Sequence, residues 1–515
     1  MKKTTRVKTI SGNEYLYEIT YYYDPEQKRT RQKSKYLGKN VNGVPVRVRE
    51  QSKYPKNVYG LGEFLPYRQA RLKLELDSLL RIYFTPTEIK VLLGILYAGL
   101  TNQNALYNSS GWYQSTVMYM RNPSLKFNPQ TITKLLQKIG DNDIPSLFCQ
   151  DLMNFLNTHQ TVVYGLSIDT GIRNSELYNG SIAGIEPKCE NLTLIYDSNE
   201  NLPVFYAPRN SPLPGMPSSQ EARAALQSLS LDTRSTLLIQ GRNSYTPMNL
   251  HELQISKVPY LLPTPTNASE IKEIERQNQS FLMDYKNSRM YNNNIIFTVP
   301  FRTTIHDKPV KGHLYCDPQK AHIEQKQICE DLRHICDRLE QIHVYAWMKP
   351  ANIVKEIAGI YEPFIEWKVE GKNLEITLKT KAISRYMRKV GRFTLLYSGV
   401  NRQWDTCLSY YDIHAEDSHF MTQLMERKQA FPYICHNQAV AQGLLFVSYL
   451  SLLLRRWVIN HMKESGLLDI YTPEKIFLEL EKIKLIEYTK RKVRPTQLSM
   501  KQKEILAALD LQIEY

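Results

Sequence analysis

The sequence lacks several patterns that would narrow its class at once. Its seven cysteines include no pair at C-x-x-C spacing, so neither a zinc ribbon nor a thioredoxin-type redox site is expected. The basic start of the chain is not followed by the apolar stretch of a secretory signal. The longest apolar run, from Ala439 to Leu454, is interrupted by polar residues and falls short of the roughly 20 residues that a membrane span needs. We therefore expect a buried core helix at this run and a reducing, cytoplasmic setting.

What the chain does contain is apolar content and positive charge. Its 515 residues are 42% hydrophobic and 23% charged, which predicts a globular protein of two to four domains. Lysine and arginine exceed aspartate and glutamate by 66 to 51, a net charge of +15. Residues 1–75 alone hold 17 basic and 7 acidic side chains, or +10. This distribution predicts a polyanionic partner, nucleic acid or an anionic membrane surface, bound mainly by the front of the chain.

A basic β-hairpin is predicted near the start of the chain. A tyrosine-rich strand precedes the turn residues Asp24-Pro25-Glu26, and a second strand follows them. Two interpretations remain open for the second strand: a solvated edge strand protected by its charge, or a surface that contacts DNA phosphates. The basic residues concerned are Lys28, Arg29, Arg31, Lys33 and Lys35.

Two helix starts are expected between residues 66 and 150. Thr85-Pro86 with Glu88 matches a capping box, and Asn128-Pro129 begins a second apolar pattern that ends at Gly140. Such short helices suit either a helix-turn-helix or a plain helical bundle, and we favour the bundle.

An aspartate ends the apolar strand that begins at Val162. Asp169 follows Ile168 directly, and Thr170-Gly171 then turns the chain. Open α/β sheets place ligand sites at such carboxyl ends, although a lone strand-end aspartate is more often a turn or cap residue.

Several blocks of the sequence resemble, in the same order, the core motifs of insertion-sequence DDE transposases of the insertion-sequence-four-like superfamily. The blocks are Tyr164–Thr170, Leu192–Tyr206, Gly241–Leu250, Tyr315–Ala321, Tyr410–Phe420, Gly443–Leu454 and Pro473–Ile486. The resemblance implies an α/β protein with an RNase-H-like mixed sheet flanked by helices. It also implies three carboxylates that hold two Mg²⁺ or Mn²⁺ ions for attack on DNA phosphodiesters. The implied partners are double-stranded DNA (element terminal repeats and target DNA) and a second copy of the chain, in a nucleoid-associated cytoplasmic setting.

The resemblance divides the chain into six regions. The expected regions are 1–65, a basic β-hairpin region; 66–150, a helical DNA-binding region; 151–258, the first part of the RNase-H-like core; 259–385, a mixed α/β insertion; 386–465, the second part of the core with the third-carboxylate helix; and 466–515, a small C-terminal module.

The implied carboxylate set is incomplete. Asp169 matches the first carboxylate, but the second position falls on Gly241, which has no side chain to bind a metal. The third is expected in a helix with the pattern Tyr, two residues, Arg, three residues, Glu, six residues, Lys. Tyr410 matches this pattern, while Ile413, Asp417 and Leu424 replace the other three residues. Asp169 and Asp417 are thus the predicted catalytic and metal-binding residues, and Arg242 and Tyr410 are predicted to contact DNA.

Three functions follow from these residues. The first is a transposase that binds element ends and cuts and transfers DNA strands with metal ions, its catalysis impaired by the altered positions. The second is a catalytically inactive, transposase-derived DNA-binding protein. The third is a nuclease on the same core, which needs the same metal ions.

Overall fold

A computed structural model describes most of the chain. The described residues are 2–10, 13–25, 27–41, 43–46, 55–101, 108–169, 189–209, 226–227, 229, 231, 236–241, 245–265, 268–278, 282–345, 347–399, 402–429, 438–488 and 492–514. The chain forms two compact units. Unit 1 comprises residues 1–61 and 483–498, and unit 2 comprises 62–482 and 499–515.

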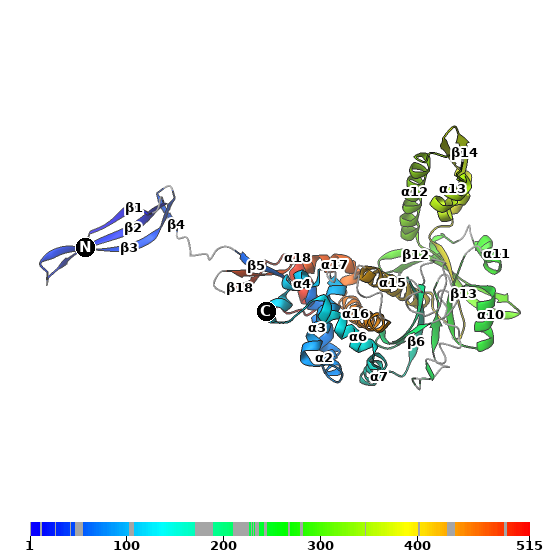
Figure 1. Ribbon diagram of the computed structural model, residues 1–515, viewed down its shortest axis with the longest axis horizontal. Coiled ribbons are helices and arrows are strands. Elements are labelled where there is room, and N and C mark those ends of the chain that lie inside the picture. The colour runs from blue at the N-terminus through cyan, green and yellow to red at the C-terminus, as the bar shows by residue number, and fades with distance from the viewer. Residues whose placement is uncertain are drawn as a thin grey trace. The chain divides into compact units, whose positions relative to one another are not determined.

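Unit 1 is built from two antiparallel sheets. Four strands pair in chain order: β1 (Lys2–Ile10), β2 (Asn13–Asp24), β3 (Arg29–Val41) and β4 (Val44–Val46) (Figure 1). β2 and β3 form the predicted hairpin, and the backbone N–H of Gln27 donates to Asp24 Oδ1 in its turn.

The second sheet of unit 1 joins distant parts of the sequence. It has the order β18 (Lys492–Pro495), β17 (Lys484–Tyr488) and β5 (Pro55–Gly60). Residues 466–515 therefore contribute strands to unit 1 and helices to unit 2, although the sequence treated them as one module.

The central sheet of unit 2 begins with five strands: β6 (Thr161–Asp169), β7 (Cys189–Asp197), β8 (Leu202–Arg209), β9 (Leu237–Ile239) and β10 (Tyr260–Thr264). Their order in space is β8-β7-β6-β9-β10. β7 is antiparallel to both neighbours, while β9 runs parallel to β6 and β10 parallel to β9. This order and polarity are those of an RNase-H-like core, so the predicted fold class is confirmed.

Four more strands extend the sheet beyond β10 to nine strands. In spatial order they are β16 (Arg392–Tyr397), β13 (Lys308–Cys316), β12 (Asn294–Ile305) and β11 (Ser288–Tyr291), and each pairs antiparallel with the next. Three of them lie within the predicted insertion, which therefore widens the core sheet rather than standing apart from it.

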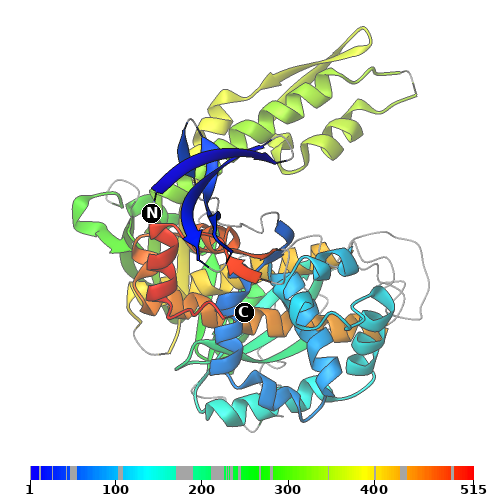
Figure 2. The same cartoon turned by 90° about the vertical axis from the view of Figure 1, so that its left-hand side faces the viewer.

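The rest of the insertion has a small core of its own. It comprises α12 (Pro318–Glu340), α13 (Pro350–Ala358), η4 (Gly359–Phe364), β14 (Ile365–Glu370), β15 (Asn373–Leu378) and α14 (Thr380–Met387). α12 packs beside α13 and the β14–β15 hairpin (Figure 2). Buried apolar residues from these elements, among them Leu339 and Val354, hold the segment together.

A helical bundle packs around one long helix. α16 (Gln438–Glu464) contacts α1 (Leu65–Lys73), α3 (Pro86–Thr101) and α6 (Pro129–Gly140). α16 is long and apolar enough to cross a membrane, but 78% of its most apolar window is buried inside the protein. Gly443 of α16 comes so close to the backbone of Leu136 that an added Cβ would meet its carbonyl oxygen at 2.1 Å. Packing this tight supports the expected core helix and the expected bundle.

Both predicted helix starts are present. The backbone N–H of Thr85 donates to Glu88 Oε2 at 2.8 Å before α3, and Asn128 Oδ1 accepts from the N–H of Thr131 at 2.9 Å in α6. The remaining described helices are η1 (Gly62–Phe64), α2 (Leu76–Leu80), α4 (Ser109–Gln114), α5 (Val117–Arg121), α7 (Ile144–Leu156), α10 (Pro247–Ser256), α11 (Ser269–Asn278), η3 (Tyr285–Asn287), α15 (Trp404–Gln429), η5 (Leu467–Asp469), α17 (Pro473–Glu481) and α18 (Met500–Ala508).

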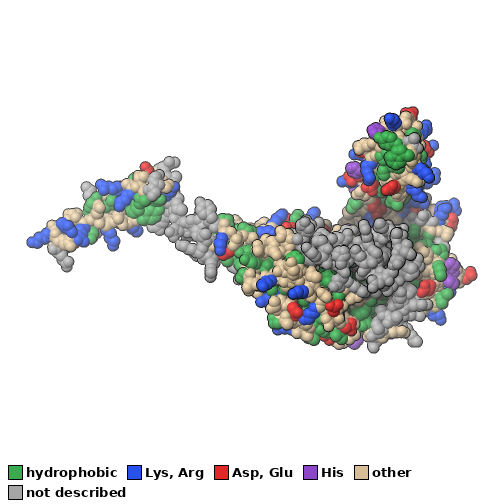
Figure 3. Space-filling view, in the orientation of Figure 1, with side chains coloured by type: hydrophobic (Ala, Val, Ile, Leu, Met, Phe, Trp, Pro, Cys, Tyr) green, Lys and Arg blue, Asp and Glu red, His purple; other side chains and the backbone are tan. Residues whose placement is uncertain are grey.

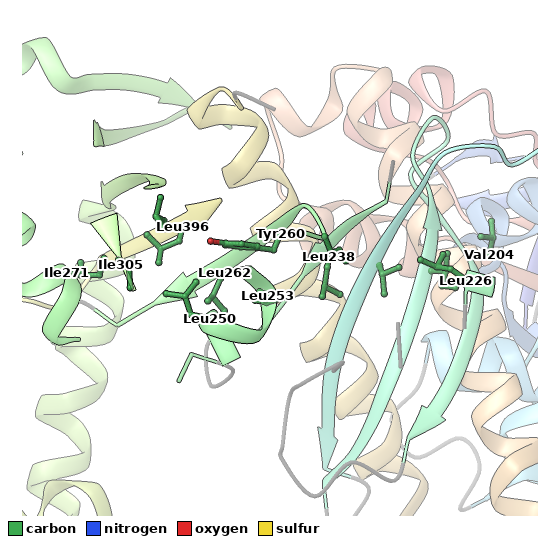
Figure 4. Close-up of a cluster of buried hydrophobic side chains, with 14 of the residues drawn as sticks. Val204, Leu226, Leu238, Leu250, Leu253, Tyr260, Leu262, Ile271, Ile305 and Leu396 are labelled. Carbon is green, nitrogen blue, oxygen red and sulfur yellow. The ribbon is translucent and has the colours of Figure 1, made fainter. Parts of the chain in front are cut away.

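The core of the central sheet is apolar and continuous. Leu238 of β9, Leu262 of β10 and Leu396 of β16 lie on it together with Leu250 and Leu253 of α10 (Figure 4). Their near-complete burial fixes the strands that carry the candidate site.

Candidate functional site

The candidate site lies at the carboxyl end of β6, the middle strand of the RNase-H-like core. The backbone of Asp169 ends this strand, paired with Cys189 of β7. β9 runs parallel to β6, with Tyr164 opposite Ile239, so both strands point toward the same edge of the sheet and β6 extends five residues past the end of β9. The side chain of Asp169 and the whole of Arg242 lie outside the described residues. The metal-binding role of Asp169 and the DNA contact of Arg242 stay predictions.

The residues that follow β9 offer no carboxylate at this edge. Gln240 is fully buried and accepts a hydrogen bond from Asn249 Nδ2 at 2.8 Å. Gly241 comes next, two residues beyond the end of the strand. Gly241 is the residue that the resemblance aligns with the second metal ligand, and glycine provides no oxygen from a side chain.

Helix α15 lies across the core sheet and contacts β6. His414 Nε2 donates to the carbonyl oxygen of Gly165 at 2.7 Å, and the imidazole is buried. Burial lowers the pKa of His414, with the Gly165 contact and the nearby Asp417 opposing the shift. A neutral histidine therefore fixes the register of α15 on β6.

Asp417 points into the protein instead of toward the end of β6. It is 3% exposed, and it accepts hydrogen bonds from Arg456 of α16 and from the hydroxyl of Tyr196. Tyr196 pairs with Val162, seven residues before Asp169 along β6, which is roughly 23 Å at about 3.3 Å per residue. The structure does not bring Asp417 to Asp169, and both oxygens of Asp417 already have strong donors.

A different aspartate lies on another side of α15. Asp412 is half-buried, and its neighbours are Tyr291 of β11, Glu416 one turn along the helix, and Asp317 and Lys320 at the start of α12. Burial raises the pKa of Asp412 to about 6; Glu416 and Asp317 add to the shift, while Tyr291 and Lys320 oppose it.

The resemblance to the transposase helix pattern did not point to Asp412, because that pattern assigns no role to the residue two positions after Tyr410. The spacing of Asp412 and Glu416, four residues apart on one helix, was the available signal. Perturbed carboxyl groups of this kind concentrate at functional sites, although ion-pair networks produce them too.

The described residues do not assemble a two-metal site. No group of three histidine, cysteine, aspartate or glutamate side chains among them is placed to hold a metal ion. Gly241 supplies no ligand and Asp417 is paired with Arg456, so the expected Mg²⁺ or Mn²⁺ pair does not fit the part of the site that the structure describes. Tyr410, the remaining match to the helix pattern, has its ring 5.9 Å from the guanidinium of Arg402.

The basic residues of β3 share one face of the unit 1 sheet. Side chains alternate along a strand, so Arg29, Arg31, Lys33 and Lys35 point the same way, while Lys28 lies in the turn with φ of 46°. Arg31 forms an ion pair with Asp24 at 3.1 Å. Within the described residues no ion pair involves Lys33 or Lys35, and both are exposed. Figure 3 shows lysine and arginine side chains along the four-stranded sheet of unit 1. We call this row of four residues the β3 basic row.

The opposite face of the same sheet is rich in tyrosine. The rings of Tyr15 and Tyr17 lie 6.1 and 5.5 Å from that of Tyr36, and Lys8 Nζ is 4.9 Å from the centre of the Tyr17 ring. Ile19 is covered, with 1% of its surface exposed. The tyrosines therefore supply the packing of this thin sheet, which leaves the β3 basic row available for a partner.

Comparison with known proteins adds one distant likeness. No family model and no curated protein matches the sequence. Among solved structures, the chain is similar to piggyBac transposase in a synaptic complex with hairpin DNA, determined by cryo-EM. The likeness covers 78% of this chain and 71% of that chain, at 12% sequence identity and a TM-score of 0.29. At these values it carries no weight for function, which has to be inferred from the residues themselves.

Proposed function

We propose that the protein is a transposase of the insertion-sequence type that binds double-stranded DNA at the ends of its element, as a homodimer. The observation that carries this proposal is the β3 basic row, in which four cationic side chains point from one face of an exposed sheet. Lysine and arginine side chains that contact phosphates release condensed counterions, which makes DNA binding favourable and dependent on salt.

Cleavage is proposed to depend on Asp169. Its strand has the central position of an RNase-H-like core, runs parallel to β9, and extends five residues past the residue that pairs with the end of β9. Divalent metal ions would supply the charge needed to stabilise the attacking and leaving oxygens of a phosphodiester, and their ligands besides Asp169 would have to be residues other than Gly241 and Asp417.

A second candidate function is an inactive, transposase-derived DNA-binding protein. Two observations favour it: Gly241 follows β9, and Asp417 is held by Arg456 and Tyr196. The two functions share DNA binding and differ in cleavage.

The DNA-binding proposal is tested with the double variant Lys33→Ala, Lys35→Ala. Affinity for duplex DNA carrying the element ends should fall, and the slope of log affinity against log salt should decrease by about 2, one unit for each lost phosphate contact. Lys368→Ala with Lys372→Ala removes the same charge from the exposed β14–β15 hairpin and serves as the control. Equal losses in both variants would mean that only net charge matters and would contradict a specific role for β3.

The cleavage proposal is tested on the same DNA with Mg²⁺ or Mn²⁺. If the native protein cuts and Asp169→Asn does not, the active transposase is supported. If the native protein binds without cutting and Gly241→Asp restores cleavage, the inactive derivative is supported, and its loss lies at the second metal ligand. Absence of DNA binding in all proteins would reject both functions.

A further inference from the structure

A cavity of about 310 Å³ lies in the helical part of unit 2, far in sequence from the candidate site. Its walls come from η1, α1, α3 and the segment from α4 to Leu125. Five cationic side chains and a single carboxylate line it: Arg68, Arg71, Arg81, Lys90, Arg121 and Asp77. A concave surface with this excess of positive charge favours an anionic ligand.

The arginines lie close enough to repel one another. Burial lowers the pKa of Arg121, and the positive charges of Arg68 and Arg71 lower it further. Asp77 offsets only part of this positive charge. Its Oδ1 is 3.4 Å from Arg71 Nε, so it pairs with one of the three arginines. An anion bound among the three guanidinium groups would relieve their repulsion.

The chain already places one anionic group at this cluster. Glu514, near the C-terminal end of the sequence, accepts a hydrogen bond from Arg68 Nη2 at 2.5 Å through its carboxylate. Its backbone carbonyl accepts from Arg121 Nη2 at 2.9 Å. Asp77 and Glu514 offset two of the five positive charges and leave a net charge of +3, so the cavity suits a dianion better than a monoanion.

The inner wall of the cavity is apolar. Ile89, Leu93 and Val117 line it and are at most 7% exposed, together with the rings of Phe64 and Tyr97. Inorganic phosphate would leave this wall without a contact, whereas an organic group attached to the phosphate would cover it.

We propose that the cavity binds a nucleotide 5′-phosphate, with the phosphoryl group between Arg68, Arg71 and Arg121 and the nucleoside against the apolar wall. Guanidinium groups match phosphoryl oxygens in paired hydrogen bonds, and a phosphomonoester carries the second negative charge that Glu514 lacks. The source is a free nucleotide or the 5′-phosphorylated end of a DNA strand. This site goes beyond the proposed function, which uses the β3 basic row for binding and Asp169 for cleavage.

Calorimetric titration of the full-length protein with dAMP, deoxyadenosine and inorganic phosphate tests the proposal. We expect dAMP to bind at least about tenfold more tightly than either of the others, since each lacks one half of the recognised group. Inorganic phosphate binding as tightly as dAMP would overturn the role of the apolar wall. Deoxyadenosine binding as tightly would overturn the role of the arginines.

Two variants keep the test independent of folding. Arg121 is exposed and, within the part of the chain that the structure describes, donates a hydrogen bond to the Glu514 carbonyl, so Arg121→Gln should fold and weaken dAMP binding about tenfold. Glu514→Gln should strengthen binding, because it frees Arg68 for the phosphate. Arg333→Gln, an exposed arginine of α12, is the matched control and should change nothing. Unchanged affinity in both Arg121→Gln and Glu514→Gln would reject the site.

A short single-stranded oligonucleotide with and without a 5′-phosphate identifies the source. Tighter binding of the phosphorylated strand assigns the cavity to a DNA end, and binding of dAMP alone assigns it to a free nucleotide. Duplex DNA with 5′-hydroxyl ends reports separately on the β3 basic row, so failure of the two proposals can be told apart.

Discussion

Two sides of helix α15 carry aspartates in opposite situations. Asp417 lies against the core with strong partners on both oxygens, Arg456 and Tyr196. Asp412 lies near the start of α12, where burial and two neighbouring carboxyl groups raise its pKa to about 6. One carboxyl group is paired with an arginine, while burial and two neighbouring carboxyl groups disfavour the charged form of the other. Two residues of the same type on the same helix can therefore have different roles.

The difference between the two aspartates separates a structural role from a candidate functional role. A buried ion pair is strongly destabilising to break, since removal of one partner leaves an uncompensated charge. A carboxyl group whose charged form is disfavoured lowers the stability of the folded protein. Such groups are expected at functional sites. Asp417 fits the first description and Asp412 fits the second.

The largest effect is expected from breaking the buried pair. Arg456→Met should lower the free energy of unfolding by about 3–5 kcal/mol, because Asp417 remains buried without its partner. Chemical denaturation measures this change. In the double variant Arg456→Met, Asp417→Leu much of the loss should return, and no recovery would contradict an electrostatic origin of the effect.

An opposite and smaller change is expected at Asp412. Asp412→Asn should stabilise the protein at pH 7 by up to about 3 kcal/mol, an upper bound because the group is only half-buried. The folded-state pKa of about 6 lies above the value of about 3.9 in unfolded chains, so the native protein loses this stability as pH rises from about 4 to 6.

Denaturation of the native protein and Asp412→Asn at pH 4 and pH 7 separates this effect from packing. The gain should be present at pH 7 and small near pH 4, where the carboxyl of the folded protein is protonated and that of the unfolded chain is about half protonated. An equal gain at both pH values would show that the charge of Asp412 is not its cause.

Much of the fold could be predicted from the sequence because it depends on local signals. The capping residues Thr85 and Asn128 and the turn at Asp24 specified helix starts and a hairpin through short-range hydrogen bonds. The RNase-H-like class was implied by the resemblance of several ordered sequence blocks to a known transposase family. The pairing of β17 with β5 was not foreseen, since its partners are more than 400 residues apart and no local pattern encodes it.

The candidate site was less predictable than the fold. The place of Gly241 after β9 could be found by aligning short blocks, because it lies at a fixed offset from a strand end. The direction of the Asp417 side chain could not be predicted from the sequence. It depends on how α15 lies on β6 and on Arg456, which comes 39 residues later in α16. The presence of aspartate in place of the expected glutamate does not indicate that the Asp417 carboxylate is buried in the core.

The smallest effect is expected at Glu416, which pairs with the same arginine as Asp417. Arg456 also pairs with Glu416, with Nη1 3.1 Å from Oε2, but the Glu416 side chain is 54% exposed. Water screens this pair, so Glu416→Gln should cost no more than about 1 kcal/mol in chemical denaturation, well below the loss in Arg456→Met. A cost as large as that of Arg456→Met would show that Glu416 takes part in holding the buried pair. With the small expected cost, the stabilisation that Arg456 gives to α15 comes mainly from its pair with Asp417, and Glu416 remains beside Asp412 on the side of the helix where charge is disfavoured.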